Sequence, residues 1–144
     1  MADEKPTLLV AKGVISRLGG AERDLLRRLP HLTNWFSVSV ATLSSCEELE
    51  HLCEENGINL YKPRDSWFPP NSAISQIFDS VHRTSKQAWK NCGSLISDIA
   101  SFDYFHIISG DGYLAMLELV PSGKPAHLYP VSYTHLTLPT NSNV

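Results

Sequence analysis

Two glycines in the first third of the chain could bring backbone N–H groups to an anion. Gly19 and Gly20 follow the apolar run Leu8–Ala11 and a short loop, and they open the amphipathic segment Ala21–Leu29. A glycine turn leading into a helix lets the backbone approach a ligand closely, and the free N–H groups of the helix attract phosphate. Arg23, one turn further on, could pair with that phosphate.

A structural interpretation of the same residues stays open. The two glycines could form only a tight turn, with Glu22 complementing the helix dipole and Arg23 solvated on the helix surface. Short motifs match by chance often enough that local sequence does not decide between the two interpretations.

A second glycine-rich turn, Ser109-Gly110-Asp111-Gly112, follows the apolar segment Tyr104–Ile108. At the end of a strand, Asp111 could accept hydrogen bonds from a hydroxylated ligand or act as a base. The alternative is an aspartate that bonds the backbone of its own turn. Among these residues, Ser109, Gly110 and Asp111 are the candidates for contact with a hydroxylated ligand.

Four aromatic or imidazole side chains have weaker claims to a function. His106 lies between apolar residues of a strand, which favours a core histidine satisfied by a backbone group, and His127 follows the same pattern. Trp67 and Phe68 lie in a proline-rich loop, where they could form a lid or simply a satellite hydrophobic cluster.

Composition and missing motifs exclude several classes of protein. The net charge is −3 and no basic stripe is present, which argues against a nucleic-acid surface. No apolar run is long enough for a membrane span, and the polar N-terminus is no signal peptide. The chain lacks a dinucleotide-binding glycine motif, a Walker A loop and a serine-hydrolase elbow. Its three cysteines lack metal-ligand spacing, so we expect free thiols, no metal and a cytoplasmic location.

Strand and helix patterns alternate along the chain and indicate the elements that position these residues. We expect strands at 8–11, 35–43, 58–61, 104–108 and 126–129. We expect helices at 21–29, from a Ser45 capping box to 56, from Asn71 or Ser72 to about 100 with a possible break at Gly93, and at 113–120.

This alternation predicts an α/β fold, a doubly wound parallel sheet of the Rossmann-like kind. The first and fourth strands should lie side by side at the topological switch point, where such sheets bind ligands beyond their carboxyl ends. The loop with Gly19-Gly20 and the turn Ser109–Asp111 would then meet at one crevice.

The C-terminal residues have the sequence of a translated cloning artefact. Residues 131–140 can be back-translated into a transposon-end adapter used in sequencing libraries, and residues 130–144 carry no charged side chain. We therefore expect an N-terminal tail at 1–6 that is disordered, a domain at 7–130 that is incomplete at its C-terminus, and an artefactual tail at 131–144 that does not pack. The alternative is a genuine polar tail.

Several segments together resemble family 4 glycosyltransferases. The residues that carry the resemblance are Gly19–Arg23, the strand Phe36–Leu43, the segment Phe102–Asp111 and Gly123-Lys124-Pro125. The resemblance covers nearly all of residues 7–130 and implies the N-terminal half of a two-domain GT-B fold. In that family the N-terminal domain binds the acceptor, and its glycine loop faces the diphosphate of a nucleotide-sugar donor.

The resemblance implies roles for particular residues. Gly19, Gly20 and Arg23 would face the donor phosphates, and Ser109, Gly110 and Asp111 would face the acceptor. The family's donor domain with its Glu-x7-Glu motif is missing, and the histidine expected near position 131 falls where the adapter begins. We therefore expect an acceptor-binding domain of a retaining, metal- and cofactor-independent glycosyltransferase, inactive by itself. Its partners would be a nucleotide sugar and an acceptor. The alternative is a non-catalytic Rossmann-like module that binds a small polar ligand.

Overall fold

The computed structural model describes residues 4–15, 19–69 and 76–129, and of residues 76–81 only the backbone. A central sheet of five strands is parallel throughout, in the order β3-β2-β1-β4-β5. The strands are β1 (Thr7–Ala11), β2 (Ser37–Ala41), β3 (Asn59–Tyr61), β4 (Tyr104–Ile108) and β5 (Ala126–Tyr129). The predicted Rossmann-like fold and the neighbouring first and fourth strands are both confirmed.

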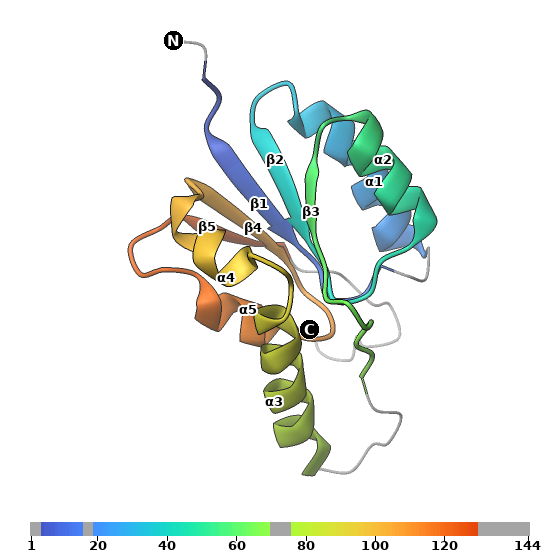
Figure 1. Ribbon diagram of the computed structural model, residues 1–144, viewed down its shortest axis with the longest axis vertical. Helices are drawn as coiled ribbons and strands as arrows, with labels where there is room; N and C mark the ends of the chain where they lie inside the picture. Colours follow the sequence, from blue (N-terminus) through green and yellow to red (C-terminus); the bar gives the residue numbers. More distant parts are fainter. Residues whose placement is uncertain (1–3, 16–18, 70–75, 130–144) are drawn as a thin grey trace, which may run out of the picture.

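Helices cover both faces of the sheet (Figure 1). One face carries α1 (Gly20–Leu32) and α2 (Glu47–Glu55). The other carries α3 (Gln76–Lys90), α4 (Leu95–Asp98) with the short 3₁₀ turn Ile99–Ser101, and α5 (Tyr113–Leu119). The helices divide between the two faces in this way because the crossovers are right-handed. The chain moves outward from β1 in one direction and then returns to build the other half of the sheet.

The core is split between the two faces of β1. Leu8 and Val10 belong to a buried cluster under α1 and α2, whereas Leu9 and Ala11 belong to a cluster under α3 and α5. Side chains of a strand alternate between faces, so a central strand covered on both sides must be apolar at every position. This is the physical reason for the uninterrupted apolar run that marks β1 in the sequence.

Two predicted helix ends differ in the structure. The N-cap of α2 is Cys46, and Ser45 donates instead to the Cys46 carbonyl, so the predicted Ser45 capping box is wrong. The backbone stays extended through Cys46 because Ser44 still pairs with Val14 beyond the ends of β1 and β2. Helix α1 continues past Leu29 to Leu32 and includes Pro30 in its last turn, so the predicted end at Leu29 is three residues short.

The remaining boundaries lie close to those expected. The predicted break at Gly93 is confirmed: α3 ends at Lys90, Gly93 takes φ +55°, and α4 starts at Leu95. Strand β2 is shorter than predicted. The proposed caps Asn71 and Ser72 and the tail 131–144 lie outside the described residues. No helix in the described part of the chain combines the length and apolar character that a membrane span needs.

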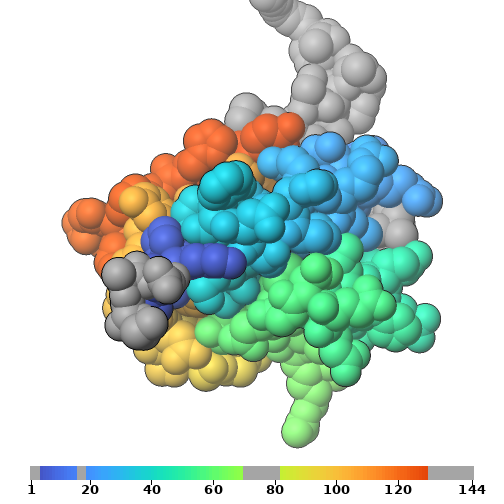
Figure 2. All heavy atoms as spheres, turned by 90° about the horizontal axis from the view of Figure 1, so that it is seen from above, coloured from blue at the N-terminus to red at the C-terminus, as the bar shows by residue number. Residues whose placement is uncertain are grey.

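Strand β5 lies at the edge of the sheet, and all four of its residues are exposed. Figure 2 views the molecule from the end that carries the amino ends of the strands, and the orange segment that includes β5 lies along the outer margin. The carboxyl ends of the strands, where the candidate residues gather, are at the opposite end. Helix α3 extends beyond the strands at that carboxyl end (Figure 1).

Candidate functional site

The loops that follow β1 and β4 touch at the carboxyl edge of the sheet. A Cβ atom placed on Gly13 would lie only 1.8 Å from the carbonyl oxygen of Asp111. Gly13 must therefore be a glycine for the two loops to pack together. The loop after β1 thus meets the turn after β4 through Gly13, a residue that sequence reasoning missed, whereas the meeting of Gly19 and Gly20 with Ser109–Asp111 stays a prediction. The position of Gly13 two residues after the first strand was the available signal.

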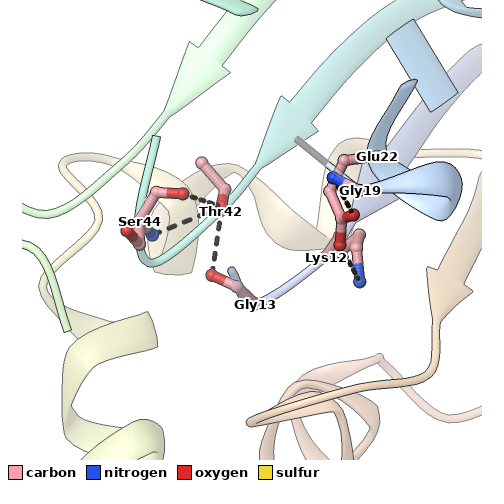
Figure 3. Close-up of polar contacts among 6 residues, drawn as sticks. All are labelled: Lys12, Gly13, Gly19, Glu22, Thr42 and Ser44. Atoms are coloured by element: carbon pink, nitrogen blue, oxygen red, sulfur yellow. Dashed lines mark hydrogen bonds and ion pairs between the residues drawn. The ribbon is translucent and has the colours of Figure 1, made fainter. Parts of the chain in front are cut away.

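The end of β2 fixes the backbone of Gly13 (Figure 3). The Gly13 carbonyl accepts hydrogen bonds from the Thr42 hydroxyl at 3.1 Å and from the backbone N–H groups of Leu43 at 2.9 Å and Ser44 at 3.1 Å. Thr42 is fully buried. Because three donors hold its carbonyl, the backbone of Gly13 has a fixed position at the base of the candidate site.

The double glycine begins α1 as the sequence predicts. Gly19 is the N-cap in an extended conformation, and its N–H donates to Oε1 of Glu22 at 3.0 Å (Figure 3). Gly20 is exposed, and a Cβ atom there would meet nothing within 4 Å. Arg23 lies exposed in the first turn, and its N–H donates to the Gly19 carbonyl. The first turn of α1 is thus ordered and open to a ligand at Gly20.

A buried lysine lies beside this turn. The side chain of Lys12 is 4% exposed, and its Nζ is 3.4 Å from Oε2 of Glu22 (Figure 3). Glu22 therefore uses one carboxylate oxygen for the Gly19 N–H and the other for Lys12. Sequence reasoning placed Lys12 in an ordinary loop. The signal was a charged residue immediately after a fully buried strand, because a lysine there can hardly reach solvent.

The turn after β4 presents a carboxylate. Gly110 and Gly112 take φ values of +148° and +81°, conformations that favour glycine. Within the described residues the Asp111 carboxylate has no hydrogen-bond or ion-pair partner, and the residue is exposed. The alternative of an aspartate bonded to its own turn is therefore not what this structure contains. Ser109 donates its N–H to the Tyr129 carbonyl, which ties the turn to β5.

Two tryptophans support this turn from α3 and from the loop after β3. Trp89 is fully buried, and its indole N–H donates to the Gly112 carbonyl at 2.9 Å. Trp67 donates its indole N–H to the Thr84 hydroxyl and packs against the buried cluster under α3 and α5. Trp67 is thus a structural residue, as in the satellite-cluster alternative. Its neighbour Phe68 is 54% exposed.

His106 is not satisfied by the backbone, so that part of the prediction is wrong. Its Nδ1 lies 2.9 Å from Nδ1 of His127, directly opposite on β5, so that one imidazole donates to the other. The sequence alone does not show that β4 and β5 pair in this register. Burial lowers the pKa of His106 to about 4, and His127 and Arg28 act in the same direction.

These histidines line a groove that is distinct from the carboxyl edge. The groove has a volume of about 390 Å³ and lies over β4 and β5 beside α1. Its other walls are mainly apolar and include Leu32, Phe36 and Tyr104. None of the described residues that line the groove belongs to the glycine turns, so the groove is not part of the candidate site.

Two of the three thiols are poor nucleophiles. Cys53 and Cys92 are buried, and burial raises the pKa of the first to about 11 and of the second to about 12. A thiol of such high pKa carries almost no thiolate at neutral pH. Among the described residues no group of three or more histidine, cysteine or acidic side chains could hold a metal ion.

The chain matches no known family model and no curated protein. Among solved structures it is similar to the C-terminal domain of the PF1911 hydrogenase from Pyrococcus furiosus. The sequence identity is 14% and the TM-score 0.50, over 88% of this chain and 93% of that domain. At this identity the likeness shows the fold alone, an α/β sheet of the Rossmann-like kind.

Proposed function

We propose that this chain is the N-terminal, acceptor-binding domain of a retaining glycosyltransferase with the GT-B fold that uses a nucleotide sugar. The observation that carries the proposal is the junction at the carboxyl edge of β1 and β4. There Gly13 packs against the backbone of Asp111, so that the loop leading from Lys12 to the exposed N-terminus of α1 adjoins the turn that carries the exposed Asp111.

Each half of this junction suits one part of a sugar-transfer reaction. As the sugar leaves, negative charge develops on the donor diphosphate, and preorganised N–H groups such as those of Gly20 and Ala21 stabilise such charge. Asp111 can accept hydrogen bonds from the hydroxyl groups of an acceptor. The donor nucleotide itself would be held by a second domain, and no residue of this chain is assigned to that part.

Extending the coding sequence tests the proposal. If residues 131–144 are adapter-encoded, the native reading frame should continue past codon 130 for about 200 residues, the typical size of a second domain, with a Glu-x7-Glu motif. The restored protein should transfer sugar from a nucleotide donor. A stop codon soon after codon 130 would contradict the proposal and favour a small-ligand-binding module.

A further inference from the structure

The exposed Asp111 is one of the residues that line a small pocket. It has a volume of about 170 Å³ and lies where α3, the turn after β4 and the start of α5 meet. The residues that line it include His82, Ser85, Gly110, Asp111, Gly112 and Leu114. Pockets for complete small molecules usually measure roughly 300–1,000 Å³. This pocket is therefore the size of one ring of a larger ligand.

Hydrogen bonds and close packing hold the wall of the pocket in place. Ser85 is fully buried, and its hydroxyl donates to the His82 carbonyl at 3.1 Å. A Cβ atom on Gly112 would lie 3.3 Å from the Cβ of Ser85, so the turn packs tightly against α3. The hydrogen bond from the Trp89 indole N–H to the Gly112 carbonyl also fixes this turn. The Asp111 carboxylate is thus presented by a backbone held on two sides.

His82 is oriented by a partner on the neighbouring helix. Its Nε2 lies 3.0 Å from Oε2 of Glu118, and Lys86 contacts the other oxygen of the same carboxylate at 3.1 Å. Lys86 is the main reason that the pKa of Glu118 lies below its ordinary value. An ionised Glu118 keeps the imidazole of His82 in one orientation at the rim of the pocket.

The charges around the pocket select the class of ligand. Among the described residues that line it there is no lysine or arginine, and the acidic one is Asp111, with Glu118 behind His82. Such a site repels phosphate and other anions. A carboxylate and an imidazole suit hydroxyl groups, which both donate and accept, whereas Leu114 offers apolar surface to C–H groups.

We propose that this pocket is a subsite for one neutral, hydroxylated ring of the acceptor, a sugar or cyclitol residue, with Asp111 and His82 as its hydrogen-bonding groups. The inference rests on the proposed function and names the acceptor class for the same edge of the sheet. It adds His82, with Glu118 as its positioning residue, to the residues predicted from the sequence.

Titration of the isotope-labelled 144-residue chain, followed by NMR, tests the subsite. The probes are methyl α-D-glucopyranoside, methyl α-D-mannopyranoside, myo-inositol and inorganic phosphate. At least one neutral probe should shift the amide signals of Gly110 and Gly112, and phosphate should not. If no neutral probe shifts these signals, or if phosphate shifts them more strongly, the subsite is wrong.

Matched variants separate the subsite from general damage. Asp111→Asn and His82→Gln should each weaken binding of the responding probe about tenfold, as expected for one lost polar contact of about 1.4 kcal/mol. Lys62→Gln removes a surface ion pair with Glu50 outside the pocket, and it should bind within about twofold of the unchanged chain. Equal losses in all three variants would overturn the assignment.

The outcome distinguishes the subsite from the proposed function. If the restored two-domain protein transfers sugar but no neutral probe binds beside Asp111, only the subsite is wrong. If the probe binds here and Asp111→Asn weakens binding as expected, while the restored protein shows no transfer to any acceptor, the pocket binds sugars and the transferase proposal fails.

Discussion

At the scale of single residues, the contact between Gly13 and Asp111 is the most sensitive point of the candidate site. Gly13→Ala places a methyl group where the Asp111 carbonyl now lies, and both partners are backbone. We expect a loss of about 1–3 kcal/mol in the free energy of unfolding, typical of overpacking. Chemical denaturation measures it, and Gly20→Ala is the control because a Cβ atom there has open space. Equal stability of the two variants would contradict this account.

Trp89 provides a second prediction for a single residue. Trp89→Phe retains most of the buried ring but removes the donor to the Gly112 carbonyl. The partly buried Gly112 carbonyl then keeps only the longer hydrogen bond from the Met116 N–H at 3.4 Å, and loss of one hydrogen bond costs about 0.5–1.5 kcal/mol. We expect that loss in denaturation, together with faster amide exchange at Gly110 and Gly112. Unchanged exchange in this turn would show that another contact holds it.

The histidine pair predicts a dependence of stability on pH. The pKa of His106 is about 4 in the folded protein and lies near the ordinary 6.5 in the unfolded chain. The unfolded state therefore binds more protons between these values, so the contribution of His106 to stability is complete above about pH 6.5 and is lost as the pH falls toward 4.

The groups around His106 allow a direct test of this pH dependence. His127 and Tyr129 face it from β5, Arg28 faces it from α1, and Tyr104 lies two residues away on its own strand. His106→Gln should flatten the stability profile between pH 4 and 6.5, measured by thermal unfolding at several pH values. An unchanged slope in this variant would exclude His106 as its source.

At the scale of elements, Glu22 joins α1 to β1. One carboxylate oxygen accepts from Gly19 and the other pairs with the buried Lys12. Glu22→Gln keeps an acceptor for Gly19 but leaves Lys12 unpaired. We expect a loss of about 1–3 kcal/mol, because an unsatisfied buried polar group costs that much or more.

A double-mutant cycle isolates this ion pair. Lys12→Met removes the buried charge and keeps a similar side-chain volume. Combined with Glu22→Gln, it should recover a large part of the stability that Glu22→Gln alone removes, because no unpaired charge remains. Strictly additive losses in urea denaturation would show that the two side chains do not interact.

At the scale of the whole molecule, this chain supplies one wall of a cleft in the proposed enzyme. Transfer requires donors on both sides of the leaving diphosphate, and loss of even one such donor typically costs about 10²–10³ in rate. We expect no sugar transfer by the 144-residue chain and clear transfer by the restored two-domain protein, measured as release of nucleoside diphosphate. Transfer by the short chain alone would refute this prediction.

Gly20→Val in the restored protein tests the role of the helix N-terminus. The branched side chain meets no neighbour in the fold, so stability should change by less than about 1 kcal/mol, the usual propensity difference in a helix. If a phosphate approaches the backbone here, turnover should fall about 10²-fold or more. Full activity of this variant would show that no ligand approaches Gly20.

The sequence by itself determined the order of elements and hence the class of fold. Apolar runs at β1 and β4, and the glycine turns after them, are local patterns, and right-handed crossovers convert their alternation into one parallel sheet. The glycine start of α1 was also predictable because helix initiation depends on neighbouring residues. The predicted capping box at Ser45 was wrong because Ser44 pairs with Val14, which is distant in sequence, and this pairing keeps the chain extended.

Only the tertiary structure decided which side chains act together. The contact of Gly13 with Asp111, the pair of Lys12 with Glu22 and the opposition of His106 and His127 depend on strand register and loop approach. Register between strands that are distant in sequence is set by the packing of whole faces, which no local pattern encodes. The pocket beside Asp111 likewise exists only because α3 packs against the turn after β4.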